Sequence, residues 1–286
     1  MDNRTPLYGH CELDDLGVLT VGGRDALAFL QGQLSQDVTR LVAGHARFAG
    51  CHTPQGRVIA VLRLLPADDG VHCILPRELV EALAARLRRY VLRARVSLTD
   101  GSGELRVTGI ADGDSRTLLV SAAGTGGPRL APSRGAPISR ELWRALDVAA
   151  GLPQVYRATS EAFVAQMLNL DCVDGIAFDK GCYTGQEIIA RAHYRGRVKR
   201  RMQRFRSATP PGMALTPGAT GQLADGRAFQ VVEAVTLADG RVEFLAVAPL
   251  AAAGEATDES AVPATPGAVS IPIEAQTLPL PYSLPH

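Results

Sequence analysis

The chain has 286 residues, of which 46% are hydrophobic and 21% are charged. A chain longer than about 250 residues usually exceeds what one hydrophobic core supports, so we expect two or three compact units. The near-average composition excludes a wholly disordered or fibrous protein. The formal net charge of +1 gives no overall attraction to nucleic acid.

Membrane and secretory signals are missing from the sequence. No apolar run approaches the roughly 20 residues that span a bilayer, and residues 1–6 lack the charged-then-apolar order of a signal peptide. We therefore expect a cytoplasmic protein. The cysteines form an odd set without C-x-x-C or zinc-ligand spacing, which argues against a disulfide framework and against a preformed metal site. Reduced thiols are expected at Cys11, Cys51, Cys73, Cys172 and Cys182.

The first hundred residues read as mixed helix and strand. A strand is expected over 13–21, and a Gly-Gly pair then opens a short amphipathic helix over 24–31. Two apolar runs, 57–65 and 71–75, flank a turn-rich break and predict a β-hairpin. Leucines at helical spacing predict a helix over 78–90 that packs on these strands.

Beyond residue 100 the sequence pattern changes, and short strands and loops become more frequent. Residues 104–122 read as a second strand pair, and 141–150 fits either a helix or a strand. Beyond residue 206, short apolar runs separated by Pro and Gly predict a small β-barrel or a sandwich. Residues 251–266 are rich in Ala, Pro, Gly and acids and predict a mobile loop.

The segment 180–187, Lys-Gly-Cys-Tyr-Thr-Gly-Gln-Glu, carries the strongest chemical signal. Thr184 and Glu187 have the spacing of a capping box, which predicts a helix that begins at Thr184. Cys182 would then lie just before a helix N-terminus and near the ammonium of Lys180. Both features favour a thiolate over a thiol, so we expect a partly exposed, electropositive cysteine.

A structural alternative exists for this cysteine, because small buried cysteines that only fill space are common. The other four cysteines lack comparable surroundings and are interpreted as structural. Gly181 and Gly185 would let the backbone turn tightly and approach a ligand closely.

The same segment resembles a known family. Residues 175–187, with Ala190 and Arg191 after them, are similar to the signature of the YgfZ family, whose members are related to the glycine-cleavage T-protein. Further matching segments cover nearly the whole chain, at residues 29–38, 53–57, 163–171 and 278–282.

The resemblance implies a fold and an activity. The implied fold is an α+β cloverleaf of T-protein type, with two α+β lobes in residues 1–205 and a small C-terminal β-barrel in 206–286. The implied function is a tetrahydrofolate-binding factor for the assembly or repair of iron–sulfur clusters in client enzymes, including radical enzymes that modify tRNA. The implied cofactor is tetrahydrofolate or a derivative, polyglutamylated forms included.

Site residues follow from the resemblance position by position. Cys182 is the motif cysteine tied to activity, and Lys180 is expected to tune it. Supporting roles fall on Gly181, Tyr183, Thr184, Gly185, Gln186 and Glu187. Folate contacts are implied for Trp143, Leu16, Asp147, Gln166, Asn169 and Arg191.

Several positions depart from the family pattern. The T-protein has a pair of aspartates where this chain has Ala60 and Val61, so the carboxylate for aminomethyl transfer is missing. Leu16 stands where the family has a tryptophan, and Ala149 where it has an acidic residue that Asp147 could replace. Trp143 matches a pocket tryptophan, although a single Trp on a helix is more often a core residue.

A basic run extends from Arg191 to Arg206 and contains eight Lys or Arg residues. It is either a solvated face or a contact for an anion, namely a polyglutamate tail, tRNA phosphates or an acidic partner protein. Two further functions stay open beside the iron–sulfur factor. One is a folate-dependent one-carbon transferase, and the other is a non-catalytic adaptor that binds RNA or protein.

Overall fold

The computed structural model describes residues 7–113, 115–123, 135–196, 198–208, 215–250 and 273–285, and the expected loop at 251–266 lies outside them. The chain divides into two compact units. Unit 1 comprises residues 1–51, 60–143 and 174–184, and unit 2 comprises 52–59, 144–173 and 185–286.

One sheet of unit 1 is built around the predicted hairpin. Its strand order is β3-β4-β5-β2-β6, and β4 and β5 pair antiparallel with Ala67 opposite Gly70 at the turn. Side chains along β4 are almost all buried, which explains why its sequence is a continuous apolar run rather than an alternating one. The bounds are β2 Leu16–Gly22, β3 Arg47–His52, β4 Val58–Ala67, β5 Gly70–Pro76 and β6 Ser97–Asp100.

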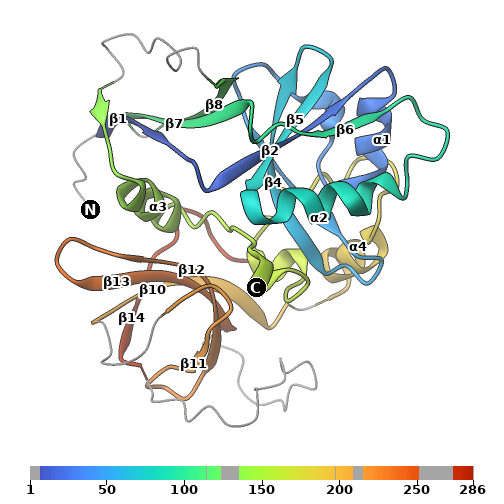
Figure 1. Ribbon diagram of the computed structural model, residues 1–286. Coiled ribbons are helices and arrows are strands. Elements are labelled where there is room, and N and C mark those ends of the chain that lie inside the picture. The colour runs from blue at the N-terminus through green and yellow to red at the C-terminus, as the bar shows by residue number, and fades with distance from the viewer. Residues whose placement is uncertain are drawn as a thin grey trace. The chain divides into compact units, whose positions relative to one another are not determined.

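Two helices accompany this sheet (Figure 1). α1 spans Ala26–Gln33 and α2 spans Arg77–Arg88, so both predicted helices are confirmed to within two residues at their starts. α2 buries Leu79, Leu83 and Leu87 and contacts β2, β5 and β6, as its leucine spacing predicted. A 3-10 turn, η1, covers Val38–Arg40.

The second sheet of unit 1 has the order β8-β7-β1-β9. Two of its strands confirm those predicted over 104–122, since β7 and β8 pair antiparallel along their length. The short strand β9 joins β1 in parallel. The bounds are β1 Leu7–Glu12, β7 Leu105–Gly113, β8 Ser115–Ala122 and β9 Ala136–Pro137.

Unit 2 contains a five-stranded sheet with the order β11-β12-β13-β10-β14. The short strands predicted beyond residue 206 are present, and a parallel bridge between Leu223 and Ile273 links the ends of the two outer strands, β11 and β14. Its core stacks Phe205 on Phe244, with ring centroids 5.3 Å apart. The bounds are β10 Arg200–Ala208, β11 Thr220–Gln222, β12 Ala228–Thr236, β13 Arg241–Pro249 and β14 Ala275–Leu278.

The remaining elements are short helices. Residues 141–150 form a helix rather than a strand, because α3 spans Arg140–Ala149. Two 3-10 turns follow, η3 at Arg157–Thr159 and η4 at Ala165–Leu168, and α4 spans Gln186–Tyr194. None of the described helices has the length and hydrophobicity to cross a lipid bilayer.

A buried ionic cluster joins β10 to β13. The carboxylate of Glu243 accepts hydrogen bonds from Arg204 at 2.6 and 3.0 Å and from Arg206 at 3.0 Å. Burial by itself would raise the pKa of Glu243, but the hydrogen bonds from the two arginines outweigh it and lower the pKa. The strand alternation that sends Phe205 and Phe244 into the core directs these charges to the opposite face.

We expect Glu243→Gln to destabilise unit 2 by about 3 kcal/mol at neutral pH, because it leaves the buried Arg204 without its counter-charge. The lowered pKa makes the carboxylate stabilising above the ordinary value of 4.5. That stabilisation is lost as the pH falls through the folded-state value. Urea unfolding of both proteins from pH 7 downward should show the gap narrowing below about pH 5.

Glu12→Gln is the matched control, since Glu12 is paired with Arg106 but both side chains are about half exposed. An exposed pair contributes less than about 1 kcal/mol. A gap for Glu243→Gln that is as small as that of the control, or that is constant with pH, would contradict the role given to Glu243.

Candidate functional site

The loop that carries the motif cysteine is held in unit 1 by Lys180. Its half-buried ammonium donates hydrogen bonds to the carbonyl oxygens of Leu34 and Gln36, each at 2.7 Å. It also lies 5.1 Å from the centre of the Tyr183 ring, within cation–π range. Burial lowers the pKa of Lys180 to about 8. At Gly181 neither a left-handed φ nor a close neighbour requires glycine.

Two buried polar side chains fasten the start of the same loop. The hydroxyl of Ser35 donates to the carbonyl of Gly175 at 2.6 Å and accepts from the amide of Gly50 at 2.8 Å. The side-chain amide of Gln36 donates to the carbonyl of Asp174. Sequence reasoning assigned neither Ser35 nor Gln36 a role. The available signal was two adjacent polar residues that follow an apolar helix.

Cys182 is exposed to solvent, as predicted, and it lies on an irregular segment of unit 1. The other thiols are protected. Burial raises the pKa of Cys73 to about 12, and burial followed by the nearby Asp171 carboxylate raises the pKa of Cys172 to about 11. Among the described residues, no cluster of three or more His, Cys, Asp or Glu side chains could hold a metal ion. Solvent accessibility therefore distinguishes Cys182 from Cys11, Cys51, Cys73 and Cys172.

The predicted capping box at Thr184 is wrong. The N-cap of α4 is Gly185, with φ of 84°, and no side chain caps the helix. A Cβ at Gly185 would lie 2.6 Å from the carbonyl oxygen of Thr53, so both the backbone conformation and the space require glycine. Glu187 pairs instead with Arg191 one turn later, at 3.2 Å. The glycine thus sets the start of the helix.

Two folate candidates lie together around η4 of unit 2. The side-chain amide of Gln166 donates to the carbonyl of Ile189 at 2.7 Å. Its buried Oε1 has no hydrogen-bond partner among the residues that the structure describes. Asn169 is fully buried, donates to the carbonyl of Met202 at 2.8 Å and accepts from Arg201 at 3.4 Å. Gln166 therefore keeps a free acceptor, whereas both ends of the Asn169 amide are used internally.

Two other unit 2 candidates lie on separate helices. Asp147 is half-buried on α3, and the exposed Arg191 on α4 is already paired with Glu187.

Trp143 is buried in unit 1, with 3% of its surface exposed. A Cβ at Gly109 would lie 2.7 Å from the indole ring, so the ring packs directly on the backbone of β7. This packing agrees with the alternative that Trp143 is a core residue, at least for the face of the ring that lies on β7. A folate contact would have to use another part of the indole.

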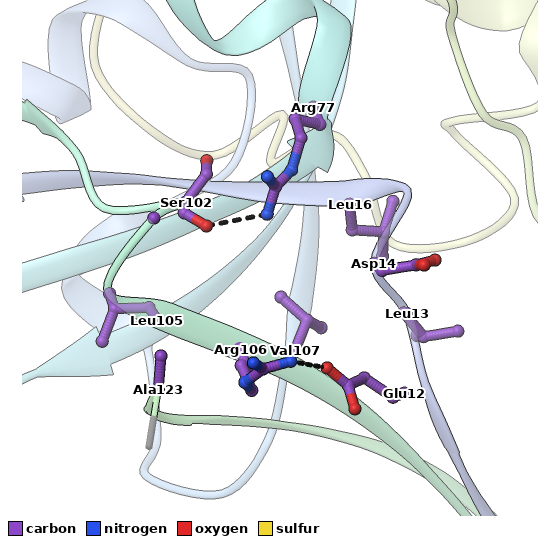
Figure 2. A pocket seen from close by; sticks show the side chains of 11 residues that line it. Glu12, Leu13, Asp14, Leu16, Arg77, Ser102, Leu105, Arg106, Val107 and Ala123 are labelled. Carbon is purple, nitrogen blue, oxygen red and sulfur yellow. Dashed lines mark hydrogen bonds and ion pairs between the residues drawn. The ribbon is translucent and has the colours of Figure 1, made fainter.

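Leu16 lines a pocket of about 410 Å³ in unit 1 (Figure 2). The charged side chains around it have partners, and Asp14 pairs with Arg140 at 2.7 Å. Arg106 pairs with Glu12, and Arg77 donates to the carbonyl of Ser102 at 2.7 Å. Where the family has a tryptophan, this chain therefore has an aliphatic side chain in a mainly polar pocket.

The basic run from Arg191 to Arg206 is not a continuous basic surface. Arg201 is buried and pairs with Asp171 at 2.9 Å, and Arg204 is buried against Glu243. Arg191 and Arg206 are also in ion pairs, and Arg197 lies outside the described residues. Four of its eight basic residues therefore balance acids of unit 2.

Comparisons with known proteins place the chain among curated relatives. It is 33% identical over 270 residues to the "tRNA-modifying protein YgfZ" of Enterobacter sp. (strain 638), covering 80% of this chain and 82% of the relative. The protein of the same description from Edwardsiella ictaluri (strain 93-146) is 29% identical over 274 residues, covering 82% of each chain. The scan against family models gave no match.

A solved structure supports the fold. The glycine cleavage system aminomethyltransferase T from Bartonella henselae superposes with a TM-score of 0.60, covering 84% of this chain and 78% of that one. At 13% identity this likeness concerns the fold alone. The chain therefore has a T-protein-like fold of mixed helix and sheet.

The titration of Lys180 tests the geometry of the loop. The chain contains two lysines, Lys180 and the exposed Lys199, so a sample labelled with ¹³C at lysine Cε should give two assignable signals. We expect the Lys180 signal to titrate with a midpoint near pH 8, below the ordinary 10.5, because its charge is desolvated. A midpoint at 10.5 would contradict the buried position.

The same shift has a consequence for stability. Between pH 8 and 10.5 the unfolded chain keeps a proton that the folded chain has released, so the free energy of unfolding should rise with pH through this window. A Lys199→Arg variant assigns the second signal and should leave that rise unchanged.

Proposed function

The chain belongs to the YgfZ family, and from this premise we propose that it is a tetrahydrofolate-binding factor for assembling or repairing iron–sulfur clusters in client enzymes, among them tRNA-modifying radical enzymes. The observation that carries the proposal is the exposed Cys182 on a loop that Lys180, Ser35 and Gln36 hold in place. In the same proposal the fold has three lobes, with residues 1–205 around the folate and 206–286 as the third.

Cys182 acts in this proposal on a cluster that is cargo rather than a resident cofactor. A single thiolate supplies one of the several ligands that a cluster needs, so the client protein must supply the others. The four less accessible cysteines cannot compete for the cluster. The role of Lys180 is to position the loop, since its donors face backbone carbonyls.

Folate binding is supported by the fit of particular groups. Gln166 offers a buried Oε1 acceptor that lacks a donor, and the amino group of a pterin ring is a suitable donor. Asn169 supports the neighbouring backbone through Met202 and is assigned a positioning role. When bound, the folate would supply or accept one-carbon units, and the residues of this chain would orient it.

An aminomethyl transferase is a poorer fit. Ala60 and Val61 occupy the positions of the T-protein aspartates, and each is 1% exposed inside β4. Neither can exchange a proton with a folate nitrogen. We therefore propose an accessory factor rather than a transferase.

We expect Cys182→Ser to abolish rescue of iron–sulfur enzyme activity in a bacterial strain that lacks its own YgfZ. The substitution removes the thiolate but, at an exposed position, should change stability by less than about 0.5 kcal/mol. Cys172→Ser is the control and should rescue as well as the wild type, given equal protein levels on immunoblot. Full rescue by Cys182→Ser would refute the proposal.

Folate binding is tested separately by calorimetric titration with tetrahydrofolate. We expect Trp143→Phe to weaken binding by about 3- to 10-fold, in line with the loss of one good aromatic contact. Phenylalanine is chosen because alanine would leave a large cavity in the core. Phe29→Leu, a core change in the same unit, should leave the affinity unchanged. Equal affinities for all three proteins would show that Trp143 does not contact the ligand.

A further inference from the structure

The connection between α2 and β6 lies in unit 1 (Figure 1), and its sequence concentrates positive charge. No Asp or Glu occurs between Glu81 and Asp100. Five arginines fall in the middle of this stretch, namely Arg86, Arg88, Arg89, Arg93 and Arg95. All but Arg86, which is half-buried, are exposed. The last turn of a helix favours basic residues through its dipole, which accounts for Arg86 and Arg88 but not for the three arginines beyond the helix.

The connection is fixed by local hydrogen bonds. The amide of Tyr90 donates to the carbonyl of Leu87 at 2.9 Å, and the amide of Ala94 donates to that of Val91 at 3.2 Å. At its end, the backbone amide of Arg95 donates to the carboxylate of Asp25 at 2.8 Å. The arginines therefore extend from a preorganised backbone, which reduces the entropy that a partner must remove.

The guanidinium groups of this connection are not held in ion pairs with any described residue, although the charge of Arg95 lies close enough to influence the carboxylate of Asp25. Among the residues that the structure describes, none of the five forms an ion pair, and Arg88 donates to the carbonyl of Leu98 at 3.3 Å. The run from Arg191 to Arg206 differs, because acids of its own unit form ion pairs with half of its basic residues. A partner that binds by charge would find more available arginines on the α2–β6 connection.

Two apolar side chains lie among these arginines. The Tyr90 side chain is 40% exposed and that of Leu92 is 91% exposed. An exposed aromatic ring between arginines suits stacking with a nucleic-acid base, and guanidinium forks suit phosphate oxygens. A single exposed leucine offers too little apolar area to hold the protein at a membrane.

We propose that the α2–β6 connection, residues 86–95, binds an unpaired nucleic-acid strand, with phosphates on Arg88, Arg89 and Arg93 and a base on Tyr90. A strand carries one phosphate per nucleotide and an aromatic face on each base, which matches a charge cluster that has no acid of its own. The site goes beyond the proposed function, since it contains neither Cys182 nor any folate candidate.

The test is fluorescence anisotropy with fluorescein-labelled 12-nucleotide oligo(U) and oligo(dT) at 50 to 200 mM KCl. We expect the triple variant Arg88→Gln, Arg89→Gln, Arg93→Gln to lower the slope of log affinity against log salt by about 2, at about 0.7 per lost contact. Tyr90→Ser should weaken binding about fivefold or more through loss of stacking. If oligo(U) binds more tightly than oligo(dT), the natural ligand is RNA. If the two bind equally, the site accepts RNA and DNA alike.

Matched variants give the opposing outcomes. Arg195→Gln with Lys199→Gln, in the other basic run, should leave oligonucleotide binding unchanged. Equal losses in that pair, or no salt-dependent binding by the wild type, would overturn the proposal. A third result would also overturn the proposal, namely that the wild type binds no oligonucleotide but binds phosphatidylglycerol vesicles or polyglutamate, and that Leu92→Ser abolishes this binding. Vesicle binding would identify a membrane as the partner, and polyglutamate binding would identify an acidic protein.

The outcome is separable from the proposed function. Cys182→Ser should bind oligonucleotide normally, and the triple arginine variant should still bind tetrahydrofolate. Circular dichroism should show both variants folded, since every substituted side chain is exposed.

Discussion

The hydrogen bonds from the Lys180 ammonium to the carbonyls of Leu34 and Gln36 determine where the motif loop lies in unit 1. A desolvated ammonium is costly, and its two carbonyl partners compensate only part of that cost, as the lowered pKa shows. This desolvation cost is confined to Lys180, and the two hydrogen bonds that accompany it fix the backbone of the loop that presents Cys182. An arginine at position 180 would put a larger, planar group in place of this compact ammonium and change the geometry of both hydrogen bonds.

Acids, rather than the count of basic residues, determine which arginines of this chain are available. Strand pairing places Arg206 directly opposite Glu243, and Arg204 reaches the same carboxylate from the same face. Arg201 is similarly neutralised by Asp171. The α2–β6 connection contains no acid between residues 86 and 95, and four of its five arginines are exposed to solvent. Two basic segments of similar density thus have opposite properties for reasons of topology.

Local patterns predicted the elements well. The hairpin around Gly70 and the helix at 78–90 were predicted because their signals, an apolar run broken by turn residues and leucines at helical spacing, are contained in the segments themselves. The start of α4 was mispredicted because Gly185, which is left-handed and lies too close to the carbonyl of Thr53 to carry a Cβ, forms the N-cap in place of Thr184.

The candidate site was predictable only in part, for a related reason. The exposure of Cys182 followed from its polar, glycine-flanked segment. The partners of Lys180 did not, because backbone carbonyls of a distant segment carry no sequence signature. The ion pairs of the basic run from Arg191 to Arg206 could not be predicted for the same reason, since Asp171 and Glu243 lie far from it in sequence. Local conformation could therefore be predicted from this sequence, whereas the partners that lie far apart along the chain could not.

The protection of the other thiols makes one exposed cysteine chemically meaningful. A thiolate is the reactive form, so a cysteine buried away from charge, such as Cys73, is inert toward metals and oxidants at physiological pH. Cys172 is closer to the surface, yet burial and the adjacent carboxylate of Asp171 both oppose its ionisation. Selectivity for Cys182 is supported by its exposure and by the suppressed ionisation of Cys11, Cys73 and Cys172, which burial and, for Cys11 and Cys172, neighbouring acids bring about.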